Sequence, residues 1–321
     1  MRAYLIRRIL QFIPVMLGVM VIVFALIELA PGDVASSWIN PRMTPSQRAE
    51  IIERFGLNEP VHIRFISWVT AALQGEFGRS FQYRQPVVDL LSVMIVPTLW
   101  LSIYALIITL LIGIPAGIIS ATKQYSAADS GLTVLSLIGI SMPAFFFGLL
   151  LIRLLAVQFP VFPMFGISNP LYTPANAFAF FTHRIWHLTL PAIVLGLAST
   201  ATFMRYTRSA MLEVIKSDYI RTARAKGLKE KVVIYRHAFR NAMIPLITLL
   251  GFQIPAMFGG AVLTESIFGL PGIGRIIVDS VSARDNPMIQ ATTAILAFLT
   301  IIGMLVSDIL YAAADPRIRY D

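Results

Sequence analysis

The stretch TLWLSIYALIITLLIGIPAGIIS, Thr98–Ser120, decides the fold, because it contains no Asp, Glu, Lys or Arg. A helix needs about 20 largely apolar residues to cross a bilayer, where its backbone must satisfy its own hydrogen-bonding groups. Five other stretches have the same character, and we expect each to span the membrane. They are Ile9–Glu28, Leu132–Val157, Leu188–Met204, Ala242–Leu263 and Ile289–Tyr311. The sequence therefore predicts an all-α membrane protein with six transmembrane helices.

The composition supports a membrane protein and excludes several kinds of chemistry. The 321 residues are 57% hydrophobic and 13% charged, with a mean hydropathy of +0.74, well above a soluble domain. The absence of cysteine rules out disulfides, thiolate zinc sites and cysteine nucleophiles. No GxxxxGK[ST], HExxH or GxSxG motif is present. We therefore expect no catalytic residue, no cofactor and no metal ligand in this chain.

Two features invite functions that we do not expect. The net charge of +9 is compatible with nucleic acid, but excess Lys and Arg in a membrane protein more often set orientation and contact anionic lipid. His183 and His187 share a helix face without nearby acids, which favours packing over a metal site. The partners predicted at this level are membrane lipid and no nucleic acid.

Basic residues set the expected topology, because Lys and Arg near helix ends stay on the cytoplasmic side. Arg2, Arg7 and Arg8 precede the first span, and six spans place the basic loop 205–241 on the same side. Both termini are therefore expected in the cytoplasm. The first apolar run is too long for a signal-peptide core, so we interpret it as a retained helix.

Charged residues inside the expected spans are few. Glu28, Arg153 and Asp308 all lie close to a span end, where they can reach water. Ionisable groups at mid-depth are typical of ion-driven secondary transporters. Their scarcity argues against a self-sufficient secondary transporter or channel, which remains the alternative from another class.

The chain divides into four regions on this topology. We expect a transmembrane helix in residues 1–29, an extracytoplasmic loop region in 30–97, a five-helix core in 98–311 that includes the cytoplasmic loop 205–241, and a cytoplasmic tail in 312–321.

The extracytoplasmic region is long enough to fold against the outer face. Its TPSQ sequence, residues 44–47, is typical of a helix start and predicts a short helix over 45–55. A second helix is expected after Asn58, with Val61, Phe65 and Val69 on its apolar face. A structural cap and a docking surface for a solute-delivering protein are equally favoured here.

The cytoplasmic loop carries nine Lys or Arg between Arg208 and Arg240, interleaved with apolar residues. Ser217 and Asp218 are suitable helix caps, and Gly227 is a natural helix terminator. Composition alone favours a basic face against lipid headgroups, with a partner-docking helix as the alternative.

The order of residues in this loop resembles a known family. IRTARAKGL, residues 220–228, followed by RHAFRNAMIP, residues 236–245, is similar to the coupling loop of permeases in binding-protein-dependent ABC importers. It looks most like the dipeptide, oligopeptide and nickel branch. The family's general pattern begins Glu-Ala-Ala, where this chain has Arg221, Thr222 and Ala223, and the spacing from Gly227 to Pro245 is longer. Both departures are typical of the peptide branch.

The resemblance extends along nearly the whole chain. Further segments similar to this branch, in order, are LAPGD 29–33, FGLNEP 55–60, GEFGRS 75–80, SMPAF 141–145, ESIFGLPGIGR 265–275 and DPR 315–317. Each alone is weak, but their order and their expected sides of the membrane agree.

The resemblance implies a non-catalytic pore subunit in the bacterial inner membrane. Family members pair through their five C-terminal helices with a second, related permease, here expected to be a different chain. They also work with two ATP-binding subunits, which hold ATP and Mg²⁺, and with an extracytoplasmic solute-binding protein. The implied cargo is a dipeptide or oligopeptide; nickel, glutathione, a sugar oligomer or another small solute remains the alternative within this class.

The resemblance also implies which residues engage the ATP-binding subunit. In the family, the helix that ends at the glycine inserts into a groove on that subunit. The residues carried over are Tyr219, Arg221, Thr222, Ala223, Gly227 and Leu228.

Overall fold

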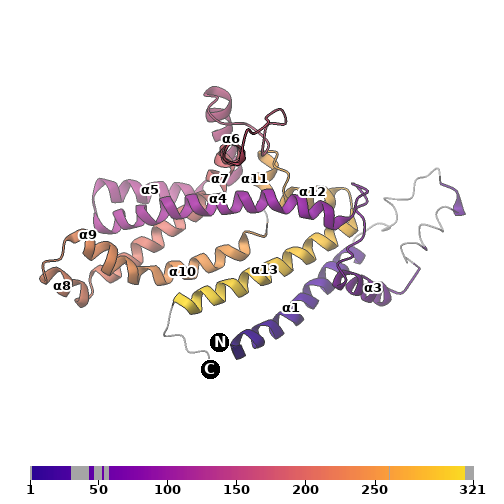
Figure 1. The fold of residues 1–321 in the computed structure, drawn as a ribbon, viewed down its shortest axis with the longest axis horizontal. Helices are drawn as coiled ribbons and strands as arrows, with labels where there is room; N and C mark the ends of the chain where they lie inside the picture. Colours follow the sequence, from indigo (N-terminus) through magenta and orange to yellow (C-terminus); the bar gives the residue numbers. More distant parts are fainter. Residues whose placement is uncertain (1, 30–42, 47–52, 54–57, 260, 315–321) are drawn as a thin grey trace.

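The computed structural model describes residues 2–29, 43–46, 53, 58–259 and 261–314 (Figure 1). Within these ranges the regular secondary structure is helical, apart from an isolated bridge between Arg79 and Pro86. The helices are α1 Arg2–Leu29, α3 Val61–Leu73, α4 Val87–Thr122, α5 Ala127–Ser141, α6 Ala144–Leu151, α7 Ala177–Ile215, α8 Asp218–Ala225, α9 Glu230–Val232, α10 Phe239–Ala256, α11 Val262–Ile267, α12 Ile273–Ser282 and α13 Asn286–Ala314. Two π-helical segments, η2 Ile152–Gln158 and η3 Val233–Ala238, continue α6 and α9.

The centre of the bundle is the pair α4 and α7, which lie along one another over most of their length. Small residues permit this approach. A Cβ on Gly117 of α4 would lie 2.6 Å from the carbonyl oxygen of Met204 on α7. Close backbone contact of this kind is how membrane helices gain packing energy, because lipid is as apolar as a leucine side chain. Helix α5 packs on α7, α10 packs on α13, and α1 covers α13.

Four helices are long and apolar enough to cross a bilayer in the described part of the chain: Arg7–Leu29, Val87–Thr122, Ala177–Ile215 and Asn286–Ile309. A fifth crossing results if the bent pair Ala127–Ser141 and Ala144–Gln158 counts as one. The all-helical membrane fold is therefore confirmed, whereas the expected six continuous spans are not all present as single helices.

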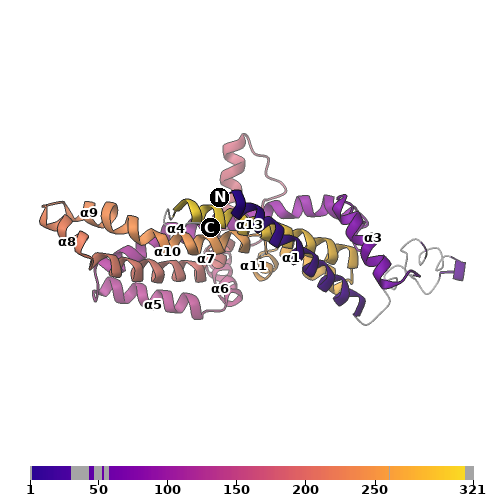
Figure 2. The same cartoon turned by 90° about the horizontal axis from the view of Figure 1, so that it is seen from below.

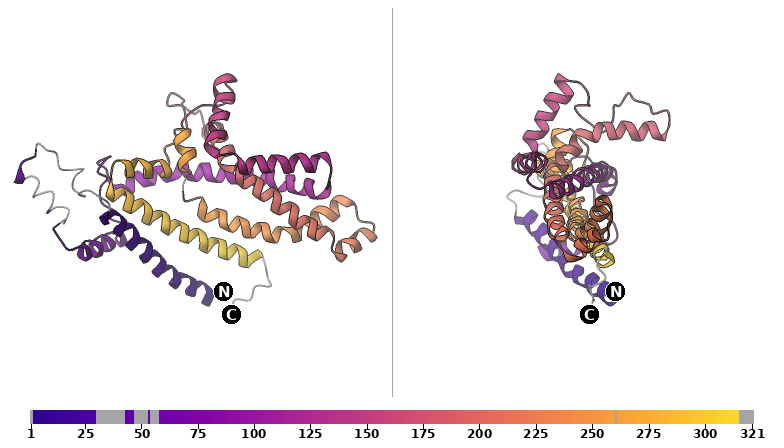
Figure 3. Two further views of the ribbon diagram at one scale, coloured as in Figure 1. Left: turned by 180° about the vertical axis from the view of Figure 1, so that it is seen from behind. Right: turned by 90° about the vertical axis from the view of Figure 1, so that its left-hand side faces the viewer.

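The third expected span, Leu132–Val157, is bent by 107° between α5 and α6. Pro143 explains the break, because a proline lacks the amide donor and disfavours a helical conformation at the residue before it. Met142 accordingly has extended backbone angles, φ −78° and ψ 124°. Figure 3 shows α5 beside α4 and α7, whereas the chain after it turns away from the bundle.

The fifth expected span, Ala242–Leu263, is divided into α10 and α11. Helix α10 contains Pro245 and Pro255 and ends at Ala256, and α11 begins at Val262. Pro255 removes a backbone donor at the last turn of α10.

The region before α4 agrees with the sequence in part. Helix α3 begins at Val61, as expected after Asn58, and Phe24 of α1 packs edge-on against Phe65 with ring centroids 5.4 Å apart. The helix expected over 45–55 lies largely outside the described residues, as does most of the tail 312–321. Helix α4 begins at Val87, so the segment expected to be a loop up to residue 97 is already helical there.

Two acids expected near span ends are partly exposed and are paired with arginines. Asp308 of α13 accepts a hydrogen bond from Nε of Arg8 at 2.8 Å, and Glu28 accepts one from Arg64 of α3. These pairs join α1 to its neighbours. Arg153, the third charged residue expected near a span end, is exposed.

The two ends of the bundle differ in their contents. Figures 1 and 2 show α8 and α9 at one end, and α3 and α12 at the opposite end. These ends hold the two segments that the sequence singles out, 217–245 and 265–275.

Candidate functional site

The candidate site is α8, a two-turn helix at one end of the bundle. Ser217 has the extended backbone angles of an N-cap residue, φ −71° and ψ 152°, and Asp218 follows in the first turn. The hydroxyl of Ser217 does not cap the helix, because it donates to the carbonyl of Val214 at 2.6 Å. At the other end Gly227 has φ +74°, a conformation that costs other residues free energy and terminates helices. The predicted bounds of the helix are confirmed, and the predicted side-chain cap by Ser217 is not.

Two apolar residues anchor α8 to the rest of the chain. Ile220 is fully buried and Ala223 is 7% exposed, and both belong to a cluster that also includes Met211 of α7 and Val233 of η3. Complete burial of an isoleucine side chain contributes about 1.5–3 kcal/mol. The helix is therefore fixed on its own chain by one short apolar stripe.

The other predicted coupling residues face outward. Tyr219, Arg221, Thr222, Gly227 and Leu228 are all exposed. The structure thus separates the predicted set into five outward residues and one inward residue, Ala223, which contacts the apolar cluster of its own chain.

Hydrogen bonds hold some of the outward side chains in place. The hydroxyl of Tyr219 accepts from Nδ2 of Asn241 at 3.0 Å, which ties α8 to the start of α10. Nη1 of Arg221 donates to Asp218 at 3.3 Å.

An ion pair spans the turn at Gly227. Arg224 donates from Nη2 and Nε to the two carboxylate oxygens of Glu230 at 2.7 and 3.2 Å. Hydrogen bonding to Arg224 lowers the pKa of the Glu230 carboxyl and raises that of the guanidinium. Sequence reasoning missed this pair, although Arg224 and Glu230 flank the predicted helix terminator and are close in sequence.

A second set of polar residues supports the helices that lead to α8. Arg208 of α7 donates from Nε and Nη2 to the two carboxylate oxygens of Asp129 at 2.9 and 3.0 Å. Ser120 of α4 and the amide of Tyr125 also donate to Asp129. One buried carboxylate therefore joins the ends of α4, α5 and α7. Asp129 and Arg208 lie 79 positions apart in the sequence, so no local pattern predicts their contact.

The opposite end of the bundle is organised around a different carboxylate. Glu265 of α11 is fully buried and accepts from Oγ1 of Thr98 at 2.7 Å and from the amide of Arg275 at 3.0 Å. Oγ1 of Thr98 in turn accepts from the amide of Ile273 at 2.9 Å. The segment 265–275 is thus closed on itself and on α4.

No arrangement suited to metal binding is evident among the residues that the structure describes, where no three His, Cys, Asp or Glu gather. His183 stacks on Tyr172 with centroids 4.0 Å apart, and Nδ1 of His187 lies 3.1 Å from the carbonyl oxygen of Gly166.

Comparisons with known proteins agree with this arrangement. The profile of the family described as "Binding-protein-dependent transport system inner membrane component" matches residues 113–320, and the profile of the corresponding N-terminal region matches residues 1–102. Together the two profiles cover nearly the whole chain.

Curated relatives match at full length. The chain is 44% identical to the oligopeptide transport system permease protein AppB of Bacillus subtilis over 321 residues, which is 100% of both chains. It is 40% identical to the di/tripeptide transport system permease protein DppB of Pseudomonas aeruginosa, covering 100% of this chain and 99% of that one. It is 38% identical to the glutathione transport system permease protein GsiC of Salmonella typhi, covering 99% of each.

One solved structure shares the fold. The MetNI methionine ABC transporter in an inward-facing conformation superposes with a TM-score of 0.54 at 14% identity, covering 71% of this chain and 97% of that chain. The shared fold, the two family profiles and the full-length relatives lead to one assignment. The chain is a multi-pass inner-membrane protein and belongs to the binding-protein-dependent transport system inner membrane component family.

Proposed function

We propose that this chain is the permease subunit of an ATP-driven importer, that it forms half of the translocation pore, and that its cargo is a dipeptide or oligopeptide. The observation that carries the proposal is full-length identity of 38–44% to permeases named for oligopeptide, di/tripeptide and glutathione transport. Glutathione, nickel or another small solute is the second choice, and an ion-driven secondary transporter is the third.

The proposed topology has six crossings with both termini in the cytoplasm. The bent pair α5 and α6 with η2 forms the third crossing, and α10 with α11 forms the fifth. The excess of basic residues around α8 and in the first turns of α1 supports a cytoplasmic position for both segments. In this topology α3 and α12 lie on the outer side, where an extracytoplasmic solute-binding protein delivers cargo.

The proposed role of α8 is to dock on an ATP-binding subunit. Its exposed residues Tyr219, Arg221, Thr222 and Leu228 provide the contact surface, and Gly227 ends the helix at the correct place. Ala223 acts from behind, by fixing the helix on the chain's own apolar cluster. A short helix anchored through one apolar stripe can transmit a movement of its partner to α7 and α10, which it contacts through that cluster.

The proposed complex contains this chain, a different but related permease, two ATP-binding subunits that hold ATP and Mg²⁺, and the solute-binding protein. This chain contributes no catalytic group, and membrane lipid surrounds it.

Purification of the tagged chain in mild detergent tests the proposal. We expect mass spectrometry to find ATP-binding subunits and a second permease, and the eluate to hydrolyse ATP with sensitivity to vanadate. Reconstituted vesicles should then take up a labelled dipeptide when ATP and the solute-binding protein are supplied. A solitary chain that takes up solute along an ion gradient would contradict the proposal.

A further inference from the structure

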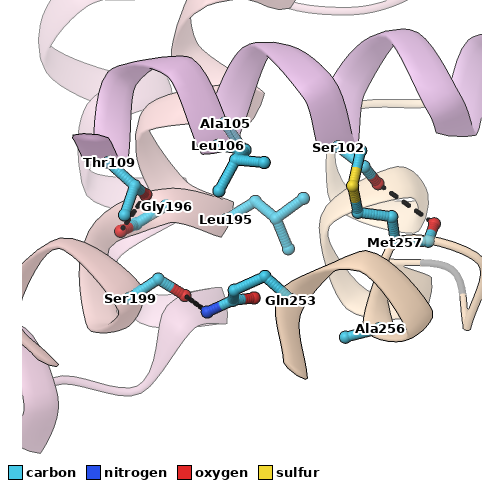
Figure 4. Close-up of a pocket in the computed structure, with 10 residues that line it drawn as sticks. All are labelled: Ser102, Ala105, Leu106, Thr109, Leu195, Gly196, Ser199, Gln253, Ala256 and Met257. Atoms are coloured by element: carbon cyan, nitrogen blue, oxygen red, sulfur yellow. Dashed lines mark hydrogen bonds between the residues drawn. The ribbon is translucent and has the colours of Figure 1, made fainter. Parts of the chain in front are cut away.

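A cavity of about 120 Å³ lies between α4, α7 and α10 (Figure 4). One ordered water needs only about 15 Å³ of such space, so the cavity has room for a small chemical group or for several waters. Its polar groups are the side chains of Ser102, Thr109, Ser199 and Gln253 and the carbonyl groups of Gly196 and Met257. The rest of its wall is apolar.

The cavity lies in the central part of the bundle. Thr109 stands near the middle of α4, Val87–Thr122, and Ser199 near the middle of α7, Ala177–Ile215. Polar groups at this depth have no bulk water to satisfy them.

The C-terminal end of helix α10 borders the same cavity. Helix α10 ends at Ala256, and the carbonyl of the next residue, Met257, accepts a hydrogen bond from the hydroxyl of Ser102 at 3.3 Å. The last carbonyl groups of a helix have no partner within that helix, so they need donors from elsewhere in the protein, from water or from a ligand. Broken helices are also where membrane transporters hold solutes.

Two hydrogen bonds in the cavity are long. Nε2 of Gln253 donates to Oγ of Ser199 at 3.2 Å, and Oγ1 of Thr109 donates to the carbonyl of Gly196 at 3.3 Å. The first distance is at the upper end of the normal range for an N–H···O bond, and the second is beyond that for an O–H···O bond. Within the described part of the chain, no donor contacts Oε1 of Gln253. The cavity thus offers a free acceptor and hydroxyl and amide donors that can change partner.

This chemistry selects one class of ligand. The described residues that line the cavity include no carboxylate, histidine or cation, so a metal ion would lack the deprotonated ligands it requires. A neutral group that both donates and accepts hydrogen bonds matches the cavity, and a peptide bond is such a group.

We propose that this cavity binds one peptide unit of the cargo during its passage, with Gln253 and Ser199 as the principal contacts. The amide of the cargo donates to Oε1 of Gln253, and its carbonyl accepts from the Ser199 hydroxyl or from Nε2 of Gln253. The inference rests on the proposed import of peptides and adds a cargo contact in the membrane.

Two substitutions of Gln253 test the site in the complete reconstituted complex. We expect Gln253→Leu to lower uptake of a neutral dipeptide three- to tenfold, since a hydrogen bond contributes about 0.5–1.5 kcal/mol. ATP hydrolysis stimulated by the loaded solute-binding protein should stay within twofold of the wild type. Gln253→Glu should raise uptake of a lysine-containing dipeptide relative to an aspartate-containing one at least threefold, a change that a purely structural role would not produce.

Thr248→Val is the matched control on the same helix, because the Thr248 hydroxyl bonds to the carbonyl of Ile244 in its own turn. It should leave both uptake and selectivity unchanged.

A thiol probe gives an independent readout, because the chain has no natural cysteine. Ser199→Cys should react with a small thiol reagent during turnover, and excess neutral dipeptide should slow that reaction at least threefold. Gln85→Cys in the exposed segment before α4 should react at a rate that the dipeptide does not change.

Unchanged selectivity in Gln253→Glu, together with no protection of Ser199→Cys, would overturn the inference while leaving the importer intact. A wild-type complex that takes up no peptide would instead overturn the proposed function, and this inference with it.

Discussion

Glu230 at one end of the bundle and Glu265 with Asp285 at the other differ in their exposure to water. Around α8, Arg224 and Glu230 form their ion pair with 41% and 56% of their side chains exposed. At the far end, Glu265 and Asp285 are fully buried. The Arg224–Glu230 pair is therefore in contact with water, whereas these two carboxylates are not.

Hydrogen-bond donors compensate for the burial of these carboxylates. Asp285 accepts hydrogen bonds from Ser80, from the amide of Gln82 at 3.0 Å and from the amide of Met288 at 3.3 Å. Buried carboxylates are tolerated only with partners of this kind. Such a network fixes the shape of its own loops. An exposed basic helix that is anchored through an apolar stripe, such as α8, is suited to binding a partner.

The largest effect is expected at the buried end. Glu265→Ala removes the acceptor of Thr98 and of the amide of Arg275 and leaves a cavity, at a cost of about 3–4 kcal/mol. Thermal unfolding of the purified chain in detergent should show a clearly lowered midpoint, or the folded chain should not accumulate.

Glu213→Ala is the control, because Glu213 is an exposed glutamate on α7. It should unfold like the wild type. Equal stability of the two variants would mean that the buried carboxylate does not hold the segment 265–275.

An intermediate effect is expected where the exposed end is anchored. Ile220→Ala should cost about 2 kcal/mol, because it removes most of a fully buried side chain at the only apolar stripe of α8. The loss should be local. Amide hydrogen exchange should speed up in α8 and not in α4, and ATP hydrolysis by the complex should continue with reduced uptake.

Ile220→Val provides the graded control, with an expected cost of about 1 kcal/mol. If Ile220→Ala instead destabilised the whole chain like Glu265→Ala, α8 would be part of the core and not a separately anchored helix.

The same contrast shows what the sequence can predict. The bounds of α8, the start of α3 and the membrane character of the long helices follow from local patterns: caps, a terminal glycine and apolar length. The two broken spans and the buried carboxylates do not. Pro143 lies at one break, but Pro115 and Pro191 lie inside continuous helices, so a proline alone does not predict where a span is broken. Glu265 pairs with Thr98 across 167 residues.

The sequence predicts the bounds of the candidate site, helix α8, but not which of its residues are buried. The family resemblance groups Ala223 with Tyr219 and Arg221, and helical position alone cannot show which side of α8 is covered. The burial of Ala223 depends on Val233 and Met211, which lie on other helices.

The smallest effect is expected for the exposed ion pair. Glu230→Gln should change the stability of the Gly227 turn by less than about 1 kcal/mol, because water screens exposed pairs and their long side chains lose entropy when they meet. The pKa of Glu230 is lowered from its ordinary 4.5 by Arg224. The contribution of the pair is therefore fully present above pH 4.5 and declines as the pH falls through the lowered value.

Amide exchange of residues 226–230 measures this prediction. After correction for the intrinsic effect of pH on exchange, wild-type protection should decline slightly below pH 4.5. Glu230→Gln should show this reduced level of protection at every pH, because it lacks the pair throughout. Arg224→Gln should behave like Glu230→Gln, since either change removes the same pair. A loss as large as that of Ile220→Ala would mean that charge, and not the apolar stripe, holds α8 in place, and the distinction between the two ends of the bundle would then fail.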